Sequence, residues 1–251
     1  AYGALHEMRI PVYLDAGTHV DIDRKPIWFG GILTIFRLEH SLRTQLDGPT
    51  SLEDAKTKFT AARERTIAKG GGVAHIYYHP CEWVHKEFWD GVNFKDGANP
   101  PREQWKAPPQ KTAEETRVAF ETFETYLRWM KVQPGVRFLT AGDALRLYRD
   151  EAREQLFSGG DVRLIAQAVG PDVTWVSYKG LTLSASEVFH FLLETLAGKA
   201  AVMHSLRTVF GPSEPGPSMT EPVTTDWSQF TRTAEDLRRY LEVHGRVPST
   251  V

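Results

Sequence analysis

Short apolar runs alternate with longer amphipathic stretches along roughly the first 150 residues, a typical domain length. The short runs are rich in β-branched and aromatic residues, a pattern typical of strands. Strands are predicted at residues 11–14, 73–78 and 136–139, while the apolar run at 32–38 is either a strand or a buried turn of helix. Strands followed by helices predict an α/β fold with a mostly parallel sheet.

Capping-box patterns mark where the amphipathic helices begin. They occur at Ser51, Thr112 and Ser184, each followed three residues later by an acidic residue. The helix after Thr112 is expected to run to about Val132, and the helical pattern near the C-terminus to end at Gly245. The side chains predicted to face inward are Leu52, Ala55, Phe59 and Ala62 in the first helix, Ala119, Phe123, Leu127 and Met130 in the second, and Leu237, Tyr240 and Leu241 in the last.

The character of the chain changes after about Phe157. Ser158-Gly159-Gly160 is interpreted as a linker, and a hairpin turn is expected at Lys179-Gly180. The second half contains no metal-ligand spacing, nucleophile motif or phosphate loop. We therefore predict two domains, residues 1–157 and a small α/β or mostly helical accessory region at 158–251.

Composition indicates a globular chain and excludes several partners. The net charge of −2 gives no basic field for nucleic acid, so no nucleic-acid partner is expected. The longest apolar runs are far too short to span a membrane. The single cysteine, Cys81, excludes an internal disulfide framework, and no cysteine-hydrolase signature surrounds it.

His79 stands at the end of the predicted strand at 73–78, just before Pro80. Because side chains alternate along a strand, His75, Tyr77 and His79 share one face, and this polar face is a poor lining for a dry core. The C-terminal tips of strands are where β/α folds place their chemistry. The alternative is a hydrogen-bonded structural histidine.

The segment Tyr77-Tyr78-His79-Pro80-Cys81-Glu82-Trp83 resembles the last motif of the polysaccharide deacetylase family, together with residues 26–31 and 137–141. The resemblance covers about the first 150 residues, taken as a domain length, and implies part of an irregular (β/α) barrel. It implies a metal-dependent hydrolase that removes N- or O-acetyl groups from a polysaccharide or cell-wall glycan. An extracytoplasmic or cell-surface location would follow, which the sequence itself leaves open.

The resemblance gives His79 the role of general acid on the leaving amine. Asp15, at the tip of the preceding strand, is the candidate carboxylate that orients the imidazole. Asp21 or Asp23 would be the next candidates for this carboxylate, and Glu82 could have the same role instead. The residues predicted to bind substrate are Tyr77, Glu82, Trp83 and Trp89.

The paired-aspartate segment with which the family's motifs begin does not occur in this sequence. We expect the family's first motifs to precede Ala1, so that a divalent metal (zinc) belongs to the intact enzyme and none is expected in this segment. A homologue that lost its metal site and kept the scaffold is the alternative. In that case the protein would be a non-catalytic glycan- or cell-wall-binding or scaffold protein.

The connection at residues 85–110 is too long for an ordinary loop. It contains Phe88, Trp89, Phe94 and Trp105 among Asn93, Asn99 and Arg102. Such rings and amides suit the faces and hydroxyls of a sugar, and they equally suit a loop that packs on itself.

Overall fold

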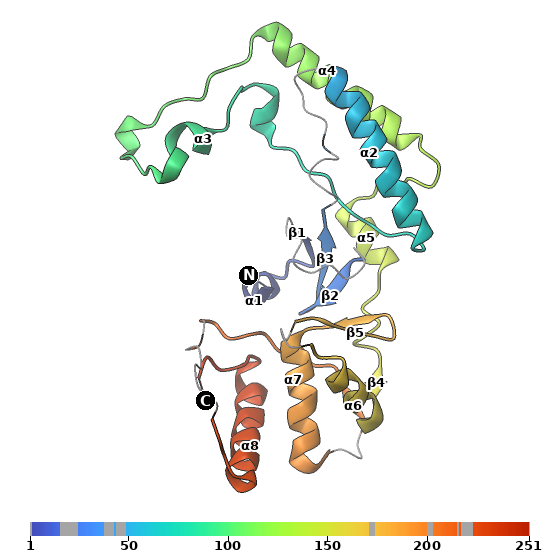
Figure 1. The fold of residues 1–251 in the computed structure, drawn as a ribbon, viewed down its shortest axis with the longest axis vertical. Coiled ribbons are helices and arrows are strands. Elements are labelled where there is room, and N and C mark those ends of the chain that lie inside the picture. The colour runs from blue at the N-terminus through green and yellow to red at the C-terminus, as the bar shows by residue number, and fades with distance from the viewer. Residues whose placement is uncertain are drawn as a thin grey trace. The chain divides into compact units, whose positions relative to one another are not determined.

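The computed structural model describes residues 2–15, 25–37, 43, 49–170, 174–199, 203–214, 216 and 223–250. Contacts divide the chain into two compact units, which are described separately. The first unit combines Ala1–Ile35 with Ala141–Val251, and the second unit is Phe36–Thr140. The fold is mixed α/β, with helices predominating over small sheets (Figure 1).

The strands of the first unit form small sheets. They are β1 (Val12–Asp15), β2 (Ile27–Phe29), β3 (Ile32–Phe36), β4 (Leu156–Phe157), β5 (Val176–Tyr178), β6 (Leu181–Leu183) and β7 (His204–Ser205). The largest sheet has the order β1-β3-β2, and the other two are the pairs β4-β7 and β5-β6. The hairpin between β2 and β3 turns at Gly30 and Gly31, whose positive φ angles suit glycine.

The prediction of a mostly parallel sheet is wrong for the described residues. The pairs β2-β3, β4-β7 and β5-β6 are all antiparallel, and no closed barrel is formed among the strands that the structure places. Within the run at 32–38, Ile32–Phe36 form a strand, but residues 73–78 make a single bridge among the described residues, from His75 to Arg37. Residues 136–139 form no strand, because they lie between a turn and the next helix without a neighbouring strand. An extended segment becomes a strand only where a neighbouring extended segment pairs with it through backbone hydrogen bonds.

Two long helices build the second unit. They are α2 (Pro49–Ala68) and α4 (Ala113–Lys131), which lie side by side in Figure 1. The hydroxyl of Tyr126 donates to the carbonyl of Ala55, while Arg63, farther along α2, donates to Pro134, just after α4. The two helices therefore run in the same direction. The remaining helices of this unit are short: η2 (Pro80–Trp83), α3 (Trp89–Asn93), η3 (Lys95–Gly97) and η4 (Arg102–Gln104).

The helical faces predicted for this unit are largely confirmed. Ala55, Phe59, Ala62, Ala119 and Met130 are buried, as expected, and Thr112 caps α4 in a capping box with Glu115. α2 begins at Pro49, two residues before the predicted cap. The prediction missed Tyr126, which is fully buried and stacks on Trp129. Burial is possible for this phenol because its hydroxyl finds a carbonyl acceptor.

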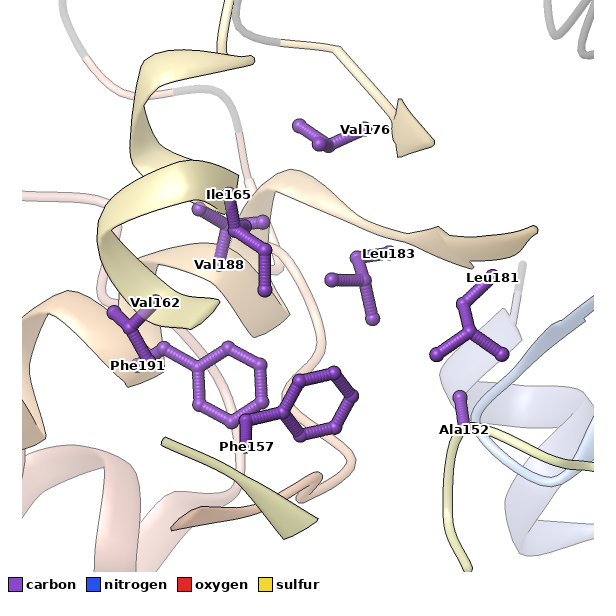
Figure 2. Packing of buried hydrophobic residues seen from close by; sticks show 9 residues of the cluster. All are labelled: Ala152, Phe157, Val162, Ile165, Val176, Leu181, Leu183, Val188 and Phe191. Atoms are coloured by element: carbon purple, nitrogen blue, oxygen red, sulfur yellow. The ribbon is translucent and has the colours of Figure 1, made fainter. Parts of the chain in front are cut away.

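The helices of the first unit are α1 (Tyr2–Glu7), α5 (Ala141–Leu147), α6 (Gly159–Gln167), α7 (Ala185–Glu194), η5 (Thr195–Lys199) and α8 (Trp227–His244). α6 and α7 contribute residues to a hydrophobic core of this unit. Figure 2 shows the core, in which the rings of Phe157 and Phe191 lie together beneath Val162, Ile165 and Val188. Phe29 of β2 contacts Trp175 and Phe210, so strands from the start of the chain pack against the region after residue 157.

Ser158-Gly159-Gly160 is not a linker. Ser158 caps α6 in a capping box with Asp161, and the adjoining Phe157 and Val162 are both buried in the core of Figure 2. Residues before and after the domain boundary predicted at residue 157 contribute to this core. The expected hairpin turn at Lys179-Gly180 is confirmed between β5 and β6.

The C-terminal helix follows its predicted face in part. Leu241 is buried and Leu237 packs beside it, whereas Tyr240 is 36% exposed and was wrongly expected inside. The helix ends at Gly245 in the left-handed conformation, as predicted. Among the described residues, no helix is long and apolar enough to cross a membrane.

Two capping boxes of the first unit respond oppositely to pH. Glu187, paired with Ser184 at the start of α7, is 3% exposed, and burial raises its pKa to about 7. Asp161 accepts hydrogen bonds from Ser158, Tyr178 and Lys179, which hold its pKa well below the usual value. A raised folded-state pKa makes an acid stabilising when protonated, and a lowered one makes it stabilising when ionised.

We expect the contribution of Glu187 to stability to be complete below pH about 4.5, the unfolded value, and to be lost as pH rises through about 7. Glu187→Gln should therefore gain stability relative to the parent between pH 5 and pH 8, by up to about 3 kcal/mol. Urea unfolding across this pH range measures the difference. Asp161→Asn is the matched control, and it should lose stability relative to the parent over the same range or show no change. If both variants gained stability over this range, the opposite pKa shifts of Glu187 and Asp161 would be contradicted.

Candidate functional site

The backbone around His79 is extended and then turns abruptly. After α2, Gly70 and Gly71 adopt positive φ angles and the chain continues without regular structure to His79. The amide of His75 donates to the carbonyl of Phe36, which fixes this segment at one point. His79 itself is extended, with φ −93° and ψ 136°, and Pro80 begins η2. His79 thus ends an extended segment and not a strand, so the predicted position at the tip of a strand is wrong for the described residues.

The carboxylate of Glu82 holds this turn. Its Oε1 accepts a hydrogen bond from the backbone N–H of His79 at 2.8 Å, and the amide of Glu82 donates to the carbonyl of His79 at 2.9 Å. The guanidinium of Arg43 binds both carboxylate oxygens of Glu82. Glu82 therefore positions the backbone of His79 rather than its imidazole.

The imidazole of His79 is exposed and lies between two aromatic rings. Its plane is perpendicular to Tyr77 at a centroid distance of 5.4 Å and to Phe88 at 5.1 Å. These edge-to-face contacts restrict the ring while leaving it open to solvent. An exposed, oriented imidazole can donate or accept a proton at a bound ligand.

Two arginines that the sequence analysis did not identify surround Tyr77. Nη1 of Arg37 donates to the Tyr77 hydroxyl at 2.9 Å, and the guanidinium of Arg43 lies over the rings of Tyr77 and Tyr78, at 5.2 and 4.8 Å from their centroids. Both arginines precede these tyrosines by more than 30 positions. No local pattern indicates such a pairing.

Trp83, predicted to bind substrate, packs against α4. Its ring stacks on Phe120 at 5.9 Å and meets Phe123 and Tyr78 edge-on or tilted at 5.0 and 5.8 Å. Its buried Nε1 has no hydrogen-bond acceptor in the described part of the chain. These contacts give Trp83 a packing role, and its contact with substrate stays a prediction.

The connection at residues 85–110 closes on itself. The amide of Lys86 donates to Pro109, and the amide of Lys111 donates to Val84, so the two ends of the loop are joined by backbone hydrogen bonds. Inside the loop, the rings of Trp89, Phe94 and Trp105 contact one another edge-to-face. The loop therefore packs on its own rings, while Trp89 and Trp105 remain 41% and 39% exposed.

Asn93 joins the two sides of this loop. It is 5% exposed, and its amide nitrogen donates to the carbonyls of Trp89 and Lys106. Its amide oxygen accepts from the backbone N–H of Lys106 at 2.8 Å. The Asn93 side chain thus supplies hydrogen bonds between the two sides of the loop that paired strands would otherwise make.

Asp15, the candidate partner of His79, lies in the first unit. It is the last residue of β1, as predicted, and is 8% exposed. Its charge adds to burial in raising the pKa of Tyr2, whose hydroxyl is hydrogen-bonded to Thr34. His79 lies in the second unit, so the pairing with Asp15 stays a prediction. The reserve partners Asp21 and Asp23 lie outside the described residues.

The described side chains do not fit a metal site of the expected kind. They include no group of three His, Cys, Asp or Glu residues that could hold an ion. His75 and His79 have the spacing of a His-x-x-x-His pair, which the sequence analysis overlooked. On extended backbone this spacing separates the two α-carbons by about 13 Å, too far to share one ion. Tyr77, between them, contacts both rings.

Comparison with family models, with curated proteins and with solved structures finds no match in any of the three. The resemblance to polysaccharide deacetylases thus depends on the quoted motifs alone.

Asn93→Ala should loosen the loop at 85–110, because the buried Asn93 side chain loses its three hydrogen bonds to the backbone of Trp89 and Lys106. Each hydrogen bond of this kind contributes roughly 0.5–1.5 kcal/mol. We expect trypsin to cleave after Lys95, Arg102 or Lys106 about tenfold faster or more, a factor equivalent to 1.4 kcal/mol.

Asn99→Ala, at an exposed position of the same loop, is the matched control and should be cleaved at the parental rate. Equal cleavage rates for the two variants would show that Asn93 does not hold the loop.

Proposed function

We propose that this chain is part of a polysaccharide deacetylase-like hydrolase that removes N- or O-acetyl groups from a glycan. The observation that carries the proposal is the exposed imidazole of His79, held at a fixed turn beside aromatic rings. This is the environment a general acid needs, since the group must reach substrate and keep its orientation.

In this role His79 donates a proton from a ring nitrogen to the departing amine or alcohol as the bond to the acyl carbon breaks. Glu82 fixes the backbone from which the imidazole projects, and Tyr77 and Phe88 limit the rotation of the ring. The divalent metal of the family would supply electrophilic activation in the intact enzyme. The described side chains do not fit such an ion.

Substrate contacts are assigned to aromatic surfaces near His79. Tyr77 contacts the His79 ring directly, and Phe88 connects His79 to the loop that carries Trp89. The exposed part of the Trp89 ring suits the apolar face of a sugar. The same surfaces would serve a non-catalytic glycan-binding protein, which is the second candidate function.

His79→Ala in the full-length protein should lower turnover on an N-acetylated glycan by roughly 10²–10⁴-fold while leaving KM almost unchanged. The reason is that an acid acting on the departing group is needed in the transition state and not in the ground state. The measurement is kcat, KM and melting temperature on one preparation.

His85→Ala is the control, because it removes another histidine from the same unit and should retain turnover per folded molecule. A His79→Ala protein with normal turnover would leave His79 as scaffold and favour the glycan-binding function. Loss of melting temperature with unchanged turnover would assign it a structural role.

A further inference from the structure

The ring of Tyr77 lies next to an excess of positive charge. Arg37 and Arg43 both approach this ring, at 5.7 and 5.2 Å from its centroid. Among the described carboxylates, Glu82 pairs with Arg43. Within the described residues, Arg37 forms a hydrogen bond to the Tyr77 hydroxyl and no ion pair. In the part of the chain that the structure describes, the cluster therefore has one half-buried guanidinium charge without a counter-charge.

Hydrogen-bond donors of the same two side chains also lack acceptors. Nε of Arg37 and Nε of Arg43 are buried and have no hydrogen-bond partner among the residues placed by the structure. A buried donor without an acceptor costs free energy, and a charged one costs more. An oxyanion bound to these guanidinium groups beside Tyr77 would provide the missing charge.

We propose that this cluster of Arg37, Arg43 and Tyr77 binds the carboxylate of an acidic sugar residue. The inference rests on the proposed function, and it specifies the substrate class as an anionic glycan of the uronate type. The planar fork of a guanidinium matches the two oxygens of a carboxylate, which a compact ammonium cannot do. The ring of Tyr77 supplies an apolar surface beside it for the sugar itself.

The location connects this anion site to the reacting group. Tyr77 lies between the arginines and His79, and its ring centroid is 5.4 Å from that of His79. A carboxylate held at Arg37 therefore belongs to the sugar at His79 or to its immediate neighbour. The cluster would position an acetylated sugar next to a charged one.

The test compares two probes that differ only in charge. One is the tetrasaccharide of alternating glucuronate and N-acetylglucosamine, and the other is the same tetrasaccharide with its carboxyl groups reduced to alcohols. Isothermal titration on the full chain at low ionic strength should show the charged probe binding about tenfold tighter, the scale of one charge-assisted pair. Higher ionic strength should reduce this preference.

Arg37→Gln should abolish the preference, and Arg37→Lys should retain part of it because the charge remains without the fork. Arg128→Gln removes one positive charge from an exposed position of the same unit and should leave the preference intact. Circular dichroism of each variant reports whether it folds. If Arg37→Gln does not fold, the parent with both probes and Arg37→Lys still decide the question.

Equal binding of the two probes, or an equal loss of both in Arg37→Gln, would overturn the anionic-glycan inference and leave the proposed function in place. Failure of the parent to bind either probe or a neutral N-acetylglucosamine tetrasaccharide would count against both. Preference for a sulfated tetrasaccharide over the glucuronate probe would assign the cluster to sulfate and overturn the choice of carboxylate.

Discussion

The hydrogen bond between the Glu82 carboxylate and the backbone N–H of His79 is the contact on which the candidate site depends. It closes the turn at Pro80, and through Arg43 it connects this turn to the tyrosine rings. A carboxylate bound to both a guanidinium and a backbone N–H is held more firmly than by either alone. The backbone of His79 is therefore held by one side chain three residues away and, through that side chain, by one guanidinium 36 positions earlier.

Elements whose cause is local could be predicted from the sequence. The capping boxes at Thr112 and Ser184 form as expected, and Ala119 and Met130 face inward because helical spacing determines a face. Extended segments were predicted less well, because a strand requires a partner at a suitable distance. Residues 73–78 are rich in β-branched and aromatic residues, yet within the described residues they form a single bridge, from His75 to Arg37.

The residues of the candidate site can be divided in the same way, into those with local causes and those whose contacts are distant in the sequence. His79 and its turn could be located from neighbouring residues, since Pro80 ends the extended segment in the sequence itself. Arg37 and Arg43 could not be, because their contacts with Tyr77 depend on tertiary structure that no nearby pattern encodes. Ser158-Gly159-Gly160 was mistaken for a linker because small residues after a serine also suit a helix N-terminus, and only the partner Asp161 distinguishes the two.

The side chains that pack the aromatic loop include Trp89, which is proposed to bind substrate. Trp89, Phe94 and Trp105 stabilise the loop by contacting one another edge-to-face, and this geometry buries ring edges and faces only in part. Asn93 supplies the hydrogen bonds that a loop without a strand ladder lacks, so the rings do not need further burial to be held in place. Phe88, at the entrance of the loop, contacts His79. The order of the loop and the orientation of the imidazole are thus coupled through one aromatic contact, and a sugar stacked on Trp89 would act on both.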